Sequence, residues 1–218
     1  LRILVTSRER LNLHEEWLFS TGGLRVPESS DDPTWRSRSA VRLFERSAVR
    51  VRNDFTLTDS NADAVIRICH LVDGMPLGVE LAATWVQLLS PEEIADEIQR
   101  NLDFLTTRAR NLPERHHSLR AVFEYSWERL DPEEQAQLRQ LSIFYGAFSL
   151  DAAQEVAGAT LFGVLSLVNK SLMQRDDDGN FAVHELIRQY ASSKMDDAER
   201  EATLNRYLHY YADFLQAA

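Results

Sequence analysis

The sequence has little cysteine and no long hydrophobic run. Cys69 is the single cysteine among 218 residues, which excludes an internal disulfide and leads us to expect a reducing, cytoplasmic compartment. One of the longest apolar stretches, residues 161–168, is interrupted by Gly163 and Ser166, and it falls far short of the roughly 20 residues that a membrane helix needs. The first residues lack the pattern of a signal peptide. Because the sequence does not begin with Met, we expect it to be cut from a longer protein.

The sequence also lacks the motifs with which many enzymes hold phosphates, metals or a nucleophile. It contains no Gly-x-x-x-x-Gly-Lys-Ser/Thr loop, no Gly-x-Gly-x-x-Gly turn and no Gly-x-Ser-x-Gly elbow. No apolar strand ends in the paired acids that could hold magnesium. His116 and His117 have no cysteine or carboxylate cluster at ligand spacing. We therefore predict no catalytic residue and no metal site in this chain, which by itself is not an enzyme.

Charge is unevenly distributed along the chain. The formal net charge is -10, which does not favour a polyanion as a partner of the whole surface. The first 52 residues, however, contain ten arginines against seven acids. We interpret this region as the solvated face of an arginine-rich helix, and a nucleic-acid patch is the alternative.

The N-terminal region predicts strands. Residues 1–5 are short, apolar and partly β-branched, as in a buried strand of a parallel sheet. Because the chain supplies no βαβ neighbours for it, we expect its sheet to lie in an upstream domain. Residues 17–20 and 24–26 predict a short strand pair, and residues 27–33 a linker.

Helices dominate the rest of the chain. Apolar spacing predicts four helices that form one bundle, at residues 35–51, about 61–72, 77–89 and 90–105. Ser90, Pro91 and Glu93 have the spacing of a capping box with proline in the first turn. Four further helices are expected near residues 117–130, 132–144, 150–156 and 161–170.

The segment after these helices predicts a β-hairpin. Residues 171–175 and 181–184 flank Asp177-Asp178-Gly179-Asn180, and short strands around an Asp-Gly turn are typical of a hairpin. Helices followed by such a hairpin have the layout of a winged helix. From Glu185 on, the chain is expected to be helical again.

Three segments are candidate nucleotide-binding sites. Thr6-Ser7-Arg8 follows the first strand, where an arginine can bind a phosphate. Gly74, Pro76 and Leu77 lie at a sharp turn into a helix whose N-terminus and proline ring could hold a base. His184 lies at a strand-to-helix junction and could donate to a phosphate. Each segment also has an ordinary alternative: a surface arginine, a helix–helix connection or a structural histidine.

The order of these segments carries a resemblance to a known family. Leu4-Val5-Thr6-Ser7-Arg8, then Gly74-Met75-Pro76-Leu77-Gly78, then Val183-His184-Glu185-Leu186 resemble the strand with its arginine, the Gly-Leu-Pro-Leu-Ala helix and the Met-His-Asp segment of STAND ATPases of the NB-ARC type. The residues of these motifs are most similar to those of bacterial members of the family, many of which are transcriptional regulators. Val183 and Glu185 depart from the family's Met and Asp, and Met75 and Gly78 from its Leu and Ala.

The resemblance implies a fold and a division of the chain. The fold is mainly α: residues 1–26 would be the edge of a P-loop nucleotide-binding domain, residues 27–110 a four-helix domain and residues 111–194 a winged-helix domain. Residues 195–218 would begin a C-terminal helical region, for which a repeat array is one alternative. Arg8 would sense the terminal phosphate, Pro76 would pack against adenine, and His184 would hold the β-phosphate of ADP.

The implied function is that of the regulatory portion of an ADP/ATP-operated switch, in signal transduction or transcriptional regulation. The parent protein would be an ATPase, with Mg bound by its P-loop part, and this chain alone would bind nucleotide weakly or not at all. Its implied partners are the upstream P-loop domain and a downstream helical-repeat sensor of the same chain. Further copies of the protein would join in a homo-oligomer on activation. The alternative is a winged-helix DNA-binding transcriptional regulator. We expect no direct DNA binding by this chain, because the helix at residues 161–170 is mostly apolar and has one cation.

Overall fold

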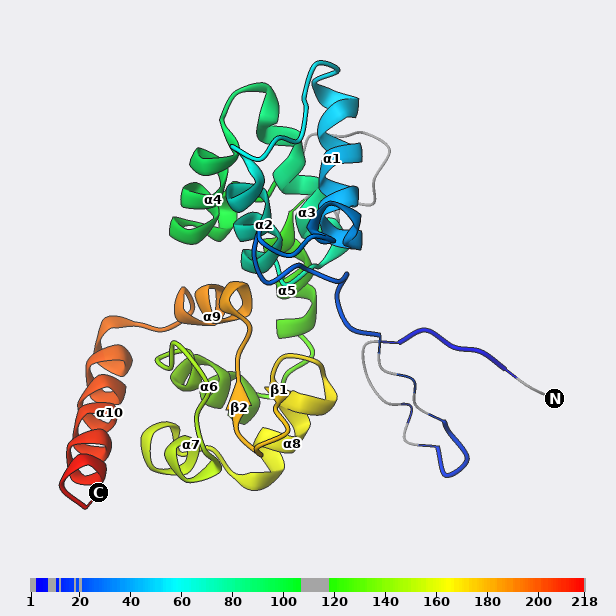
Figure 1. Ribbon diagram of the computed structural model, residues 1–218. Coiled ribbons are helices and arrows are strands. Elements are labelled where there is room, and N and C mark those ends of the chain that lie inside the picture. The colour runs from blue at the N-terminus through cyan, green and yellow to red at the C-terminus, as the bar shows by residue number, and fades with distance from the viewer. Residues whose placement is uncertain are drawn as a thin grey trace. The chain divides into compact units, whose positions relative to one another are not determined.

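The computed structural model describes residues 3–7, 11, 13–17, 19, 21–106 and 118–217. The chain divides into two compact units (Figure 1). We call Thr21–Ser126 the first helical unit, and Leu1–Ser20 with Trp127–Ala218 the second helical unit. Each is described by itself. The domain boundaries expected from the sequence stay a prediction.

The first helical unit confirms the predicted helices, with shorter bounds. Its elements are η1 Trp35–Ser37, α1 Ser39–Val51, α2 Ala62–Leu71, α3 Pro76–Ala83, η2 Thr84–Gln87, α4 Pro91–Arg100, η3 Leu102–Phe104 and α5 Leu119–Trp127, whose last residue belongs to the second unit. The helix expected at residues 77–89 changes to a 3-10 turn at Thr84, and the one expected to reach residue 105 ends at Arg100. The first difference is a tighter final turn, as helix ends commonly show. The second is a break in the helix, because the backbone of Asn101 is extended and a separate 3-10 turn, η3, follows it.

The core of the first helical unit lies where α1 packs on α3 and α2 packs on α4. Phe44, Val65 and Ile68 are fully buried there, as are Val79 and Ile94. The start of α4 is fixed by the predicted capping box: Ser90 Oγ accepts from Glu93 N, and Glu93 accepts from Ser90 N. The apolar stripes of the sequence therefore form a single closed core.

The second helical unit contains helices and a hairpin. Its elements are α6 Pro132–Leu141, α7 Leu150–Ala157, α8 Leu161–Asn169, β1 Gln174–Arg175, β2 Phe181–Ala182, α9 Glu185–Ser192 and α10 Asp197–Ala217. The strands are antiparallel, with Gln174 opposite Ala182 and Arg175 opposite Phe181. The predicted hairpin is thus confirmed, and its turn is closed by a 2.7 Å hydrogen bond from Asn180 N to Asp176 Oδ1.

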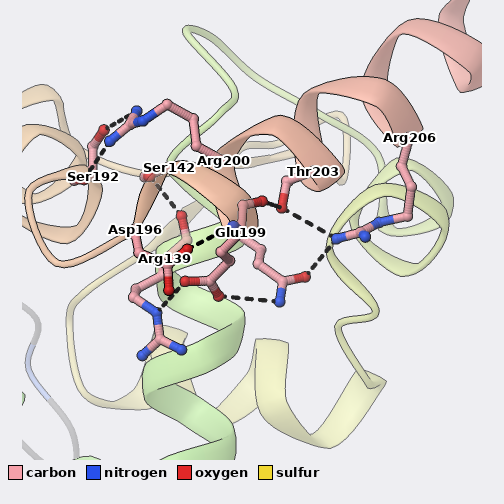
Figure 2. Close-up of polar contacts among 9 residues, drawn as sticks. Arg139, Ser142, Ser192, Asp196, Glu199, Arg200, Thr203 and Arg206 are labelled. Atoms are coloured by element: carbon pink, nitrogen blue, oxygen red, sulfur yellow. Dashed lines mark hydrogen bonds and ion pairs between the residues drawn. The ribbon is translucent and has the colours of Figure 1, made fainter.

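The last helix, α10, is attached to the second helical unit by polar contacts (Figure 2). Arg139 of α6 donates to Glu199 of α10 at 2.8 Å, and Arg206 donates to the carbonyl oxygen of Val156 at 2.7 Å. Thr203, fully buried, donates to the Glu199 carbonyl oxygen one turn back. These contacts hold α10 beside α7 (Figure 1).

The N-terminal strands are not formed. Residues 3–7 have no regular secondary structure, and Ile3 and Leu4 are 75% and 96% exposed. The described residues of the expected pair, at 17–20 and 24–26, form no strand either. The described residues of these segments form no strand, because a strand needs backbone partners and the described residues offer none. Pairing of residues 1–5 within a sheet of an upstream domain stays a prediction.

Candidate functional site

The three predicted site segments lie in different parts of the chain. Thr6 and Ser7 are exposed in an irregular stretch of the second helical unit, and Arg8 is outside the described residues. Gly74, Pro76 and Leu77 belong to the first helical unit, and His184 belongs to the second. The geometry of each is therefore given within its own unit, and a shared nucleotide site stays a prediction.

Gly74 lies in a tight backbone crossing. Asp73 and Gly74 have positive φ angles of 50° and 60°, which end α2 sharply. Leu24 N donates to the Gly74 carbonyl oxygen at 2.8 Å. A Cβ atom on Gly74 would lie 2.2 Å from the Leu24 carbonyl oxygen, and one on Gly23 would lie 2.1 Å from that of Asp73. Only glycine fits at this crossing, which fixes the chain just before α3.

The start of α3 is held on one side and open on the other. Pro76 takes the first helical position and is exposed, whereas Leu77 is half-buried. Gly78 packs so closely that an added Cβ would lie 2.8 Å from Val72 Cβ. The departure from the family's Ala at this position therefore has a structural cause. The exposed proline ring is available to pack against a flat ligand.

His184 caps α9 with its own ring. Its Nδ1 accepts a 3.1 Å hydrogen bond from Leu186 N, which places the imidazole at the helix N-terminus. An accepting Nδ1 carries no proton, so in the neutral ring the proton is on Nε2. The imidazole of the half-buried His184 thus lies at the positive end of a helix.

The residue after His184 belongs to a dense ionic cluster. Glu185 accepts from Arg188 Nε and Nη2 at 2.7 and 2.8 Å, and from Gln189 at 3.0 Å. Arg188 also donates to the Ser142 carbonyl oxygen, and its guanidinium lies 3.9 Å from the centre of the Tyr145 ring. Burial raises the pKa of Glu185, but the hydrogen bonds from Arg188 and Gln189 outweigh it and hold the pKa below its usual range. The carboxylate next to His184 is therefore ionised and fixed.

Sequence reasoning missed two members of this cluster. Arg188 is 8% exposed, and its position three residues after Glu185 could have indicated an ion pair on one helix face. Tyr145 lies 43 positions before Arg188 in the sequence, so no local pattern could have indicated it.

Other chemistry is limited in the part of the chain that the structure describes. No group of three or more His, Cys, Asp or Glu residues there could hold a metal ion. Cys69 is buried in α2, and burial raises the pKa of its thiol to about 12, which makes it a poor nucleophile. No described helix has the length and apolar character that crossing a membrane requires.

Comparison with known proteins places the chain beside bacterial regulators. A protein of Mycobacterium tuberculosis with the provisional name HTH-type transcriptional regulator is 37% identical over 221 residues, which cover 97% of this chain and 24% of that protein. An uncharacterized protein of the same species is 33% identical, over 95% of this chain and 53% of its own length. Regulatory protein AfsR of Streptomyces coelicolor is 28% identical over 70% of this chain and 16% of AfsR. No family model matches the chain.

The chain thus spans about a quarter of the first of these relatives and half of the second. Their names support a likeness to bacterial transcriptional regulators more than they support a nucleotide switch, and they run against our expectation that DNA is no partner. Membership of the STAND ATPases stays a prediction.

Proposed function

We propose that this chain is a regulatory segment of a bacterial transcriptional regulator. The observation that carries the proposal is 37% identity along almost the whole chain to a protein named as an HTH-type transcriptional regulator. The match covers both helical units and about a quarter of that larger protein.

We further propose that the segment responds to ADP or ATP in the parent protein. The support is the ordered set of motifs resembling NB-ARC proteins, together with the local geometry of two of them. Pro76 offers an exposed ring at a helix start, and the His184 imidazole lies at a helix N-terminus. Helices α6, α7 and α8 followed by the β1–β2 hairpin have the order expected of a winged helix, which would close over the nucleotide and control oligomerisation.

Calorimetry with ADP and ATP tests this proposal. It compares the present chain with a protein extended through an upstream P-loop domain. We expect binding only to the extended protein, and we expect His184→Ala to weaken ADP binding. His184→Asn is a matched variant, because asparagine can still accept from Leu186 N and keep the helix cap. Failure of the extended protein to bind either nucleotide would reject the switch and leave the regulator assignment in place.

A second candidate is direct DNA binding by the winged-helix part, which the names of the relatives favour. The geometry of α8 fits it poorly. Phe162 is 83% exposed, Leu161 and Leu165 are partly exposed, and Lys170 is bound to Glu134 at 2.6 Å. A groove-reading helix needs free polar or cationic side chains. Lys170→Gln, which removes the charge but keeps a donor for Glu134, should therefore leave any DNA affinity nearly unchanged, as measured by fluorescence anisotropy with a labelled duplex.

A further inference from the structure

Helix α1 carries a row of arginines for which the described residues supply no ion-pair partner. Arg42, Arg46 and Arg50 are exposed and follow one another at intervals of four residues, which puts them about 6 Å apart along one face of the helix. The opposite face is anchored by Ala40, Val41, Phe44 and Ala48, all fully buried. We call Arg42, Arg46 and Arg50 the α1 basic stripe.

The α1 basic stripe differs from the other arginines around it. Six described arginines of the first helical unit each have an acidic partner within ion-pair distance: Arg36, Arg38, Arg52, Arg67, Arg100 and Arg120. Over the described residues, no such partner is found for the three stripe arginines. Like charges four residues apart destabilise a helix. The stripe is therefore a concentrated positive charge in a chain of net charge -10.

A further arginine that has no ion pair with a described residue lies beside the start of this row. Arg25 N donates to Ser39 Oγ at 2.9 Å, and Ala40 N donates to the Arg25 carbonyl oxygen. Ser39 is exposed one turn before Arg42, so Arg25 extends the positive surface toward the helix N-terminus, which is itself positive.

We propose that the α1 basic stripe binds the phosphate backbone of duplex DNA. Rigid guanidinium groups at regular spacing suit a phosphate row. A protein partner is disfavoured because Val49, 41% exposed, is the one large apolar side chain exposed on α1, and protein interfaces depend on a buried apolar or aromatic centre. The acidic remainder of the chain repels DNA, so approach would be directed to this face. The choice of DNA rests on the proposed regulator function, but it does not depend on nucleotide binding.

The expected salt dependence of DNA binding follows from counterion release. Three phosphate contacts give a slope of about -2.7 for log affinity against log salt, so raising salt from 50 to 200 mM should weaken binding by a factor on the order of 40. With contacts to phosphates alone, binding should not depend on sequence, and its Kd should be in the micromolar range or weaker.

The test is fluorescence anisotropy of a labelled duplex titrated with the 218-residue chain at several salt concentrations. The stripe variant carries Arg42→Gln, Arg46→Gln and Arg50→Gln. The matched control carries Arg36→Gln, Arg67→Gln and Arg100→Gln, which remove the same charge from exposed arginines that are already paired. We expect the stripe variant to lose binding at 50 mM salt, the control to keep a slope near -2.7, and lysine at the three stripe positions to retain binding.

Three results would overturn the proposal. The first is no DNA binding by the unaltered chain at 50 mM salt. The second is an equal loss in the stripe variant and the control, which would indicate net charge alone. The third is tighter binding of a poly-glutamate peptide than of DNA, which would identify a protein-docking face. None of these results bears on nucleotide calorimetry, so the two proposals fail separately.

Discussion

Replacing Gly74 with alanine should destabilise the first helical unit through two separable effects. Its φ of 60° is a left-handed conformation, which costs a residue with a Cβ roughly 1–2 kcal/mol. The new methyl group would also lie 2.2 Å from the Leu24 carbonyl oxygen, and such overpacking typically costs about 1–3 kcal/mol. Alanine also lowers the conformational entropy of the unfolded chain, which offsets roughly 0.4–1 kcal/mol of this destabilisation. The free energy of unfolding should therefore fall by about 2–4 kcal/mol.

Two other glycines separate these effects. Gly158 has a φ of 57° and open space where a Cβ would lie, so Gly158→Ala should cost only about 1 kcal/mol. Gly23 has an ordinary φ but a Cβ position 2.1 Å from the Asp73 carbonyl oxygen, so Gly23→Ala should cost about 1–2 kcal/mol, through the clash alone. Gly74→Ala should lower the free energy of unfolding by more than either of these two substitutions.

Urea denaturation followed by NMR signals from each unit measures these changes, because Gly158 and Gly74 lie in units that need not unfold together. If Gly74→Ala costs no more than Gly158→Ala, the close approach to Leu24 does not constrain the turn before α3. The structural account of this candidate site segment would then be wrong.

Three further predictions concern single side chains. Ser90→Ala removes the cap of α4 and should lower the free energy of unfolding by about 1 kcal/mol in urea denaturation; no change would show that the box is dispensable. Cys69 should react with iodoacetamide only when the first unit opens, because it has no exposed surface; labelling faster than opening would contradict its burial. The Arg38 hydrogen bond, with those from Thr34, lowers the pKa of Asp32 from 3.8 to about 2. Ionised Asp32 therefore stabilises the fold above pH 3.8, and this contribution is lost as the pH falls through 2. Asp32→Asn should flatten that part of the stability profile.

Local signals in the sequence were sufficient for most helices and for the hairpin. Ser90-Pro91-Glu92-Glu93 encodes a helix start within four residues, and the structure has the complete capping box there. The Asp-Gly turn likewise lies between two paired strands. In both cases the stabilising partners are near neighbours in the sequence, so a pattern can reveal them.

Features that depend on distant partners could not be predicted in this way. Residues 3–7 have the composition of a strand, but strand formation requires hydrogen-bond partners that composition does not supply. The need for glycine at Gly74 comes from Leu24, fifty positions away. The pairing of arginines also depends on residues distant in the sequence, since Arg36 binds Asp59 and Arg67 binds Asp96. The sequence alone could show the arginine excess but not which arginines remain unpaired.

The two proposals make different demands on the chain. The proposed nucleotide contacts come from Pro76 in one unit and His184 in the other, so nucleotide affinity would depend on how the units are placed. The α1 basic stripe lies on one helix with a fully buried inner face, so its geometry is fixed within a single unit. DNA binding by the stripe therefore requires only the first helical unit to be folded, whereas the proposed nucleotide contacts require residues of both units.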